Sequence, residues 1–210
     1  MTQTHPEDTP AEKLGRVLMA STQEILGRSE FERVVQTTGQ NPHIKEYQGN
    51  NLKLKFSSVA LSGILNAIEV EYGARPGRGL ILRIGGAGFK YGLREFGPEL
   101  GLTDLAFRLL PLKRRSAFLV KALAEPANQV YPGRVQVVEA DGRFLWQVSR
   151  CDAAEAAGLD SGQLESLLVG FLREAMYWVS GGKPAVVESI PVGTETATFL
   201  CKIDVYQKTY

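Results

Sequence analysis

The strongest constraint on the fold is a change of hydrophobic period near Arg134. Before this point apolar residues recur at helical spacing, as they do over residues 57–72. After it, the segment RVQVVEADGRFLWQVSR alternates apolar and polar residues on both sides of Asp141-Gly142, which predicts a β-hairpin with a tight turn. Because helix and strand periods exclude each other within one segment, the chain must combine a helical part with an antiparallel sheet.

The remaining segments follow the same two patterns. Helical spacing predicts helices over residues 11–27, 29–37, 57–72, 80–96, 113–128 and 161–180. The segment PAVVESIPVGTETATFLCKIDVYQK predicts two more strands around a turn near Gly193, whereas residues 37–51 predict a loop and GARPGRG, residues 73–79, predicts a helix break. We therefore predict an α+β fold in which helices pack on one face of a small antiparallel sheet.

Composition narrows the class of protein. With 210 residues, 44% of them hydrophobic, the chain has enough apolar mass for one domain, which we place at residues 11–210 after a disordered segment 1–10. The formal charge is +1, which predicts no nucleic-acid partner. Cys151 and Cys201 allow no disulfide framework, and the sequence offers neither a signal pattern nor a membrane span, so we expect a cytoplasmic protein.

The glycines of the segment GGAGFKYGLREFG allow two interpretations. A dinucleotide-binding fingerprint would need a third glycine where Tyr91 stands, which disfavours that interpretation. If residues 80–96 form one helix, Gly85, Gly88 and Gly92 share a face. Each glycine costs a helix about 1 kcal/mol relative to alanine. This face therefore predicts a close approach by another helix, a second subunit or an apolar ligand.

Catalytic groups are scarce in the sequence. His5 and His43 fall in the expected disordered segment and loop, and no metal or nucleotide motif occurs. We therefore predict no catalytic residues, no metal and no cofactor. Large aromatic residues are more informative, because they line pockets for planar or oily ligands as well as ordinary cores. Together with the three glycines, the candidate ligand-binding residues are Trp146, Phe171, Tyr177 and Trp178.

A resemblance to a known family covers residues 134–204. The hairpin RVQVVEADGRFLWQVSRC, the helix SGQLESLLVGFLREAMYWVSGG and the strands AVVESIPVGTETATFLCKI resemble the 4-vinyl reductase or hydrocarbon-binding domain. That family is similar to TRAPP transport-complex subunits, in the ligand-binding fold of NO signalling and Golgi transport. The matching positions are Gly170, Gly193 and Phe199. The resemblance implies a TRAPP-like fold with an apolar cavity between helices and sheet, and a homodimer formed through helices.

The resemblance also bears on metal binding. Sensing members of the family carry zinc-binding cysteines on both sides of the turn glycine, and the matching positions here hold Ser189 and Ala197. Neither residue supplies a thiolate, so this family zinc site is expected to be lost.

We therefore expect a non-enzymatic module that binds a small hydrophobic ligand as sensor or carrier, acting on a separate protein partner. Two further functions stay open. One is that of an enzyme or accessory factor in tetrapyrrole (bacteriochlorophyll) biosynthesis, which the family name implies. The second is that of a dimeric assembly or scaffold subunit.

Overall fold

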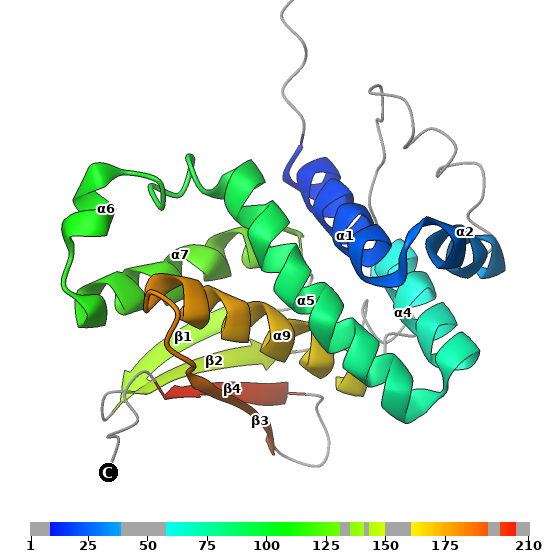
Figure 1. The fold of residues 1–210 in the computed structure, drawn as a ribbon. Helices are drawn as coiled ribbons and strands as arrows, with labels where there is room; N and C mark the ends of the chain where they lie inside the picture. Colours follow the sequence, from blue (N-terminus) through cyan, green and yellow to red (C-terminus); the bar gives the residue numbers. More distant parts are fainter. Residues whose placement is uncertain are drawn as a thin grey trace, which may run out of the picture.

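The computed structural model of the chain describes residues 9–38, 58–130, 135–140, 143–149, 161–192 and 198–204. The helices are α1 (Pro10–Leu26), α2 (Arg28–Thr37), α4 (Ser58–Tyr72), α5 (Ala74–Phe96), α6 (Leu105–Leu109), α7 (Leu112–Val130) and α9 (Ser161–Val179). The strands are β1 (Val135–Ala140), β2 (Arg143–Ser149), β3 (Val186–Val192) and β4 (Thr198–Asp204). Figure 1 shows the helices gathered on one side of the sheet, which confirms the predicted α+β class.

The sheet is antiparallel with the order β1-β2-β4-β3. Ala140 pairs with Arg143, as the predicted hairpin requires, although the turn residues themselves lie outside the described residues. Alternation along β2 buries Phe144, Trp146 and Val148, because successive side chains of a strand point to opposite faces. The predicted strands on both sides of residue 141 are thus confirmed.

Two glycines join consecutive helices with no intervening loop. Gly27 separates α1 from α2 with φ +80°, and Gly73 separates α4 from α5 with φ +84°, a region of backbone space that favours glycine. The predicted helix break over residues 73–79 is wrong beyond Gly73. Pro76 lies in the first turn of α5, where backbone N–H groups have no partner within the helix.

The predicted loop over residues 37–51 falls mostly outside the described residues. Helix α6 was not predicted, because five residues are too few to show a helical period. In the part of the chain that the structure describes, no helix combines the length and the apolar composition needed to cross a bilayer.

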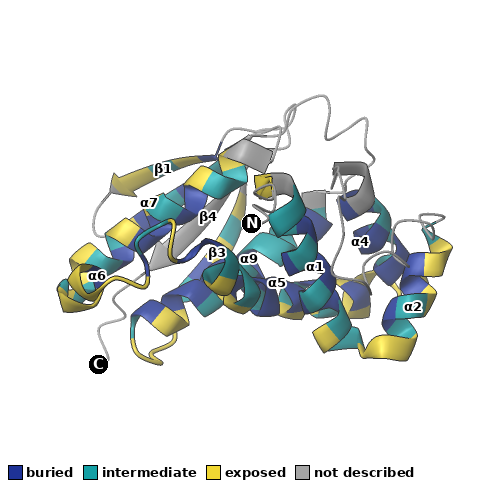
Figure 2. Ribbon diagram, turned by 90° about the horizontal axis from the view of Figure 1, so that it is seen from above, coloured by how far each residue is buried: buried dark blue, intermediate teal, exposed yellow. Residues whose placement is uncertain are grey.

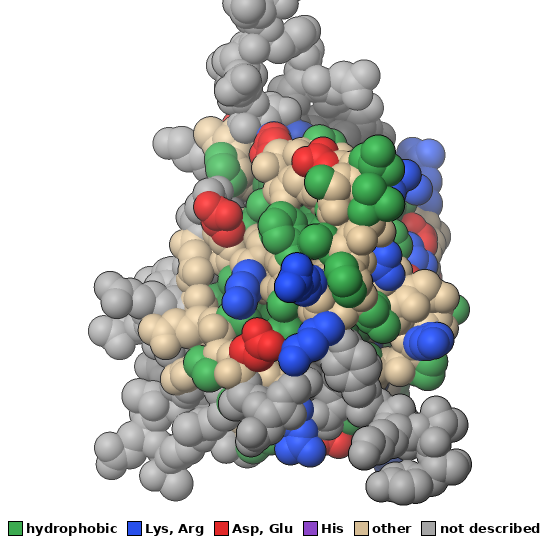
Figure 3. All heavy atoms as spheres, turned by 90° about the vertical axis from the view of Figure 1, so that its left-hand side faces the viewer, with side chains coloured by type: hydrophobic (Ala, Val, Ile, Leu, Met, Phe, Trp, Pro, Cys, Tyr) green, Lys and Arg blue, Asp and Glu red, His purple; other side chains and the backbone are tan. Residues whose placement is uncertain are grey.

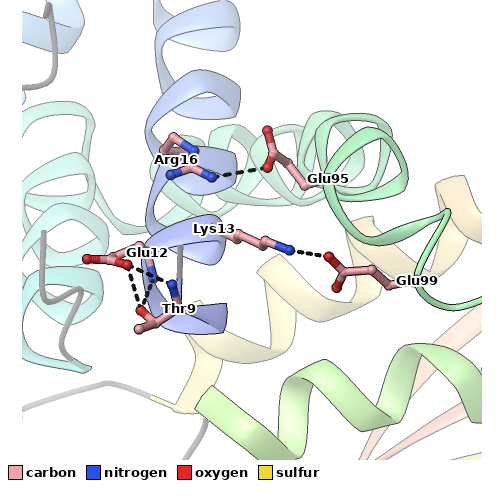
Figure 4. Close-up of polar contacts among 6 residues, drawn as sticks. All are labelled: Thr9, Glu12, Lys13, Arg16, Glu95 and Glu99. Carbon is pink, nitrogen blue, oxygen red and sulfur yellow. Dashed lines mark hydrogen bonds and ion pairs between the residues drawn. The ribbon is translucent and has the colours of Figure 1, made fainter. Parts of the chain in front are cut away.

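Helix α1 is fixed at its start and along its length (Figure 4). The Thr9 side chain accepts a hydrogen bond from the Glu12 backbone N–H, while the Glu12 carboxylate accepts one from the Thr9 N–H at 2.7 Å. Lys13 pairs with Glu99, and Arg16 pairs with Glu95 at 3.2 Å. Such partly exposed ion pairs add little stability. They lie where α1 runs beside the end of α5 and the residues that follow it.

The central contact of the helical layer is the crossing of α5 and α9. A Cβ atom on Gly85 would collide with the Leu167 carbonyl and lie 3.0 Å from the Phe171 nitrogen. A Cβ atom on Gly170 would collide with the Leu82 carbonyl and lie 3.1 Å from its Cα. The two helices therefore touch backbone to backbone. Figure 2 shows the buried residues where α1, α4, α5 and α9 face one another.

Replacing Gly170 with alanine tests this crossing. We expect Gly170→Ala to lower the free energy of unfolding by about 3 kcal/mol, because the methyl group forces two backbones apart. Gly86→Ala is the matched control on α5, since its Cβ would lie 3.7 Å from the nearest atom. The higher helix propensity of alanine should stabilise this variant by up to about 1 kcal/mol. Denaturant unfolding measures both. Equal stabilities of the two variants would contradict the close crossing.

Candidate functional site

An apolar cavity of about 160 Å³ lies between the helical layer and the sheet. Helices α1 and α5 contribute one part of its wall, and α7, α9 and the first two strands contribute another. The wall is formed almost entirely by aliphatic and aromatic side chains. Ser21 supplies the one hydroxyl among the described lining residues, and its Oγ donates to the Leu18 carbonyl at 2.9 Å. The cavity therefore favours an uncharged apolar guest.

The three glycines predicted to share a face of α5 have two different roles. Gly85 lies at the crossing with α9, where no side chain fits. Gly88 and Gly92 instead open onto the cavity, and their nearest contacts for an added Cβ are Ser21 at 3.8 Å and Phe171 at 3.9 Å. One residue holds the helices together, while the other two leave room beside them. Gly85 also borders the cavity.

Trp146 forms the sheet side of the wall. Its side chain is 1% exposed, and its indole Nε1 donates to the Val120 carbonyl of α7 at 3.0 Å. The neighbouring helix end is attached to the sheet by Asn128, whose amide nitrogen donates to the Val135 carbonyl at 2.9 Å. These contacts attach α7 to β1 and β2 on one side of the cavity.

The four candidate aromatic residues do not all meet at the cavity. Trp146 and Phe171 line it, whereas Tyr177 and Trp178 lie beyond it, 49% and 37% exposed. Phe89 connects the two groups, since its ring centroid lies 5.6 Å from that of Phe171 and 5.8 Å from that of Trp178. Five of the seven predicted ligand-binding residues thus border one cavity, and their binding role stays a prediction.

Residues of α1 were missed as part of the site. Leu14, Val17, Leu18 and Ser21 recur at helical spacing and all line the cavity. The periodic pattern predicted a buried face, but nothing in the sequence indicated which helix that face would meet. Pro126, inside α7, also lines the cavity and was not predicted to do so.

The titratable groups of the described residues lie away from the cavity. None of the lining residues in the described part of the chain is of a type that titrates near neutral pH. The shifted tyrosines lie elsewhere: a hydrogen bond to Glu24 raises the pKa of Tyr91, and burial together with a hydrogen bond to Glu30 raises the pKa of Tyr72. Across the described ranges, no cluster of three His, Cys, Asp or Glu residues is placed to hold a metal ion.

Comparison with known proteins gives a fold but no sequence family. No protein-family model and no curated protein matches the chain. Among solved structures, an oxygen-binding H-NOX domain related to soluble guanylate cyclases, in its oxygen complex, aligns over 96% of this chain and 100% of its own, with a TM-score of 0.59 and 9% identity. The chain shares the H-NOX fold.

Two further structures agree. A mutant of the T. tengcongensis H-NOX aligns over 93% of this chain and 95% of its own, with a TM-score of 0.60 and 9% identity. A structure from work on "Modulating Heme Redox Potential Through Protein-Induced Porphyrin Distortion" aligns over 90% of this chain and 96% of its own, with a TM-score of 0.58 and 10% identity. At such identities the likeness concerns the fold.

This result corrects the expected family. The resemblance to the 4-vinyl reductase or hydrocarbon-binding domain, and through it to TRAPP subunits, is wrong, because the similar structures are H-NOX domains. The resemblance rested on the order of hairpin, helix and hairpin and on three matching residues. An antiparallel sheet crossed by one helix gives that order in unrelated α+β families. Gly170, one of the three, has a packing role at the α5–α9 crossing.

Replacing Trp146 with phenylalanine tests how much the indole contributes to the stability of the protein. We expect Trp146→Phe to cost about 2 kcal/mol, since it leaves the buried Val120 carbonyl without this donor and enlarges the cavity. Trp178→Phe is the matched control and should cost less than about 1 kcal/mol because that ring is part exposed. Chemical denaturation measures both variants. Similar losses would show that the Trp146 contact contributes no special stability.

Proposed function

We propose that this chain is a non-enzymatic module that binds a small, uncharged hydrophobic molecule in the cavity between helices and sheet. The observation that carries the proposal is a cavity of about 160 Å³ whose described lining residues include one hydroxyl and no titratable group. An engineered cavity of about 150 Å³ lined by apolar side chains stays dry and binds benzene or xenon. A guest of this size and polarity therefore suits the present cavity.

Haem is the group that the fold neighbours suggest, since work on one of them concerns haem redox potential. Proteins hold haem iron through His, Cys, Met or Tyr. Among the described residues that line the cavity there is none of these types, and there is no Lys or Arg to pair with the acid groups of a porphyrin. The volume also falls below the roughly 300–1,000 Å³ of common ligand pockets. The described residues of this cavity therefore do not fit haem.

Tetrapyrrole synthesis and a scaffold role have less support than ligand binding. A role in tetrapyrrole synthesis rested on the family resemblance that the H-NOX fold corrects, and the cavity-lining residues that the structure describes include no catalytic group. A homodimer, a separate protein partner and a scaffold role stay predictions. None of them requires the cavity, so ligand binding is the function that the geometry favours.

A haem titration tests the statement that the cavity does not fit haem. We expect added haem to give no saturable one-to-one complex in the absorption spectrum, because the described part of the wall offers no iron ligand. His5 and His43 lie outside the described residues. A stoichiometric complex that is lost in His43→Ala or His5→Ala would contradict the proposal and identify the missing ligand.

Stability measurements with small apolar ligands test the statement that the cavity binds such a guest. A ligand at about 100 times its dissociation constant adds about 2.7 kcal/mol to the stability of its protein. For a chain of this size that gain raises the unfolding midpoint by roughly 5–10 °C. We expect benzene-sized aromatics or xenon to produce such a shift in the native protein. Gly88→Leu should abolish the shift, because its isobutyl group enters the cavity.

Gly79→Leu is the matched control for this experiment. It makes the same substitution in the same helix at an exposed position where nothing lies within 4 Å of an added Cβ. Binding should persist in this variant. Loss of binding in both variants, or in neither, would contradict the cavity as the binding site.

A further inference from the structure

The end of the molecule formed by α6 and its neighbours exposes large apolar side chains. Leu105 and Leu109 of α6 are 71% and 74% exposed, Phe118 of α7 is 43% exposed, and Trp178 of α9 is 37% exposed. We call these four residues the α6 patch. Figure 1 shows α6 projecting at one end of the protein, and Figure 3 shows apolar and basic side chains side by side on that face.

The α6 patch is continuous through one buried ring. Phe107 of α6 is 4% exposed, and its ring centroid lies 5.6 Å from that of Phe118 and 5.8 Å from that of Trp178. The Phe107 and Trp178 rings are stacked at 9°. Leu105 and Leu109 stand one helical turn apart. The buried Phe107 thus anchors a short helix whose opposite face points its leucines outward.

The sequence around the patch is strongly basic. Residues 105–124, LAFRLLPLKRRSAFLVKALA, contain five Lys or Arg and no Asp or Glu, although the whole chain has a formal charge of only +1. Arg115 is engaged inside the protein, where it donates to the Val179 carbonyl at 2.7 Å. The other four, Arg108, Lys113, Arg114 and Lys121, are exposed.

These charges stand beside the apolar groups. Arg108 lies between the two leucines along α6, and Arg114 and Lys121 lie four residues before and three after Phe118 on α7. Such charge complements an anionic surface. Segments that lie in a membrane interface combine exposed leucines, aromatic rings and flanking cations, and the α6 patch has all three. We propose that the α6 patch and its cations dock the protein peripherally on an anionic lipid bilayer.

The position of the patch relates docking to the cavity without depending on it. Leu100 and Leu102, in the connection from α5 to α6, line the cavity just before the exposed leucines begin. An apolar guest partitions into a bilayer, so docking would place the cavity near its source. Docking itself requires no cavity ligand, so each of the two proposals can fail without the other.

Vesicle sedimentation tests the docking proposal. The full chain is mixed with vesicles of phosphatidylcholine alone and with vesicles of equimolar phosphatidylcholine and phosphatidylglycerol. We expect binding to the anionic vesicles, weak binding to the neutral ones, and release as salt screens the charges. The chain has two tryptophans, of which Trp146 is buried, so a blue shift of the emission would report Trp178 entering the interface.

Two double variants separate the apolar and the charged contributions. Leu105→Ser with Leu109→Ser, and Arg114→Glu with Lys121→Glu, should each weaken binding to anionic vesicles by on the order of tenfold or more. The matched controls are Val70→Ser, at a 79% exposed position of α4, and Arg75→Glu, at the opposite end of α5. The controls should bind like the native chain. Because all of these positions are exposed, circular dichroism should show unchanged folding.

Several results would overturn the proposal. They are no binding to either vesicle type, equal binding to both, or binding that the leucine and charge variants leave unchanged. Gel filtration of the native chain and the leucine variant tests whether a second copy of the chain, and not a membrane, covers the α6 patch. A dimer that dissociates in the leucine variant, without vesicle binding by the native chain, would make the α6 patch a subunit interface and the proposal wrong.

Discussion

The backbone contact between α5 and α9 at Gly85 and Gly170 is the constraint on which the rest of the structure depends. Each glycine packs against a carbonyl of the opposite helix, so neither position admits even a methyl group. This contact fixes the distance of the helical layer from the sheet, because α9 lies directly against the sheet and α5 lies on α9 (Figure 1). Helix α1 packs on α5, and hydrogen bonds attach α7 to β1 and β2.

Helix α5 packs backbone to backbone against α9 at Gly85, but it leaves space along the turns that follow. Beyond the crossing, Gly88 and Gly92 carry no side chain. The crossing and the indole of Trp146 keep the neighbouring elements from closing the gap. An apolar cavity results. A cavity that is already present in the folded chain suits a small guest, since no binding energy is lost in forming it.

The H-NOX fold does not by itself decide what this cavity binds. Structures with the fold include an oxygen complex and a protein studied for its haem, yet the wall here lacks an iron ligand among the described residues. A fold fixes where a cavity can form, whereas the side chains on its wall decide what enters. The exposed leucines and cations around α6 add a second, separate surface whose composition matches an anionic membrane.

Local rules determined much of this protein from its sequence. Helical and alternating patterns placed most helices and all four strands, because the period of buried side chains is set by the geometry of one element. They also placed Gly85, Gly88 and Gly92 on one face. The sequence did not determine that Gly85 would meet the Leu167 carbonyl of α9, that α1 would line the cavity, or that Tyr177 and Trp178 would lie outside it. Only the tertiary structure decided these, since contacts between elements distant along the chain depend on how all faces pack at once.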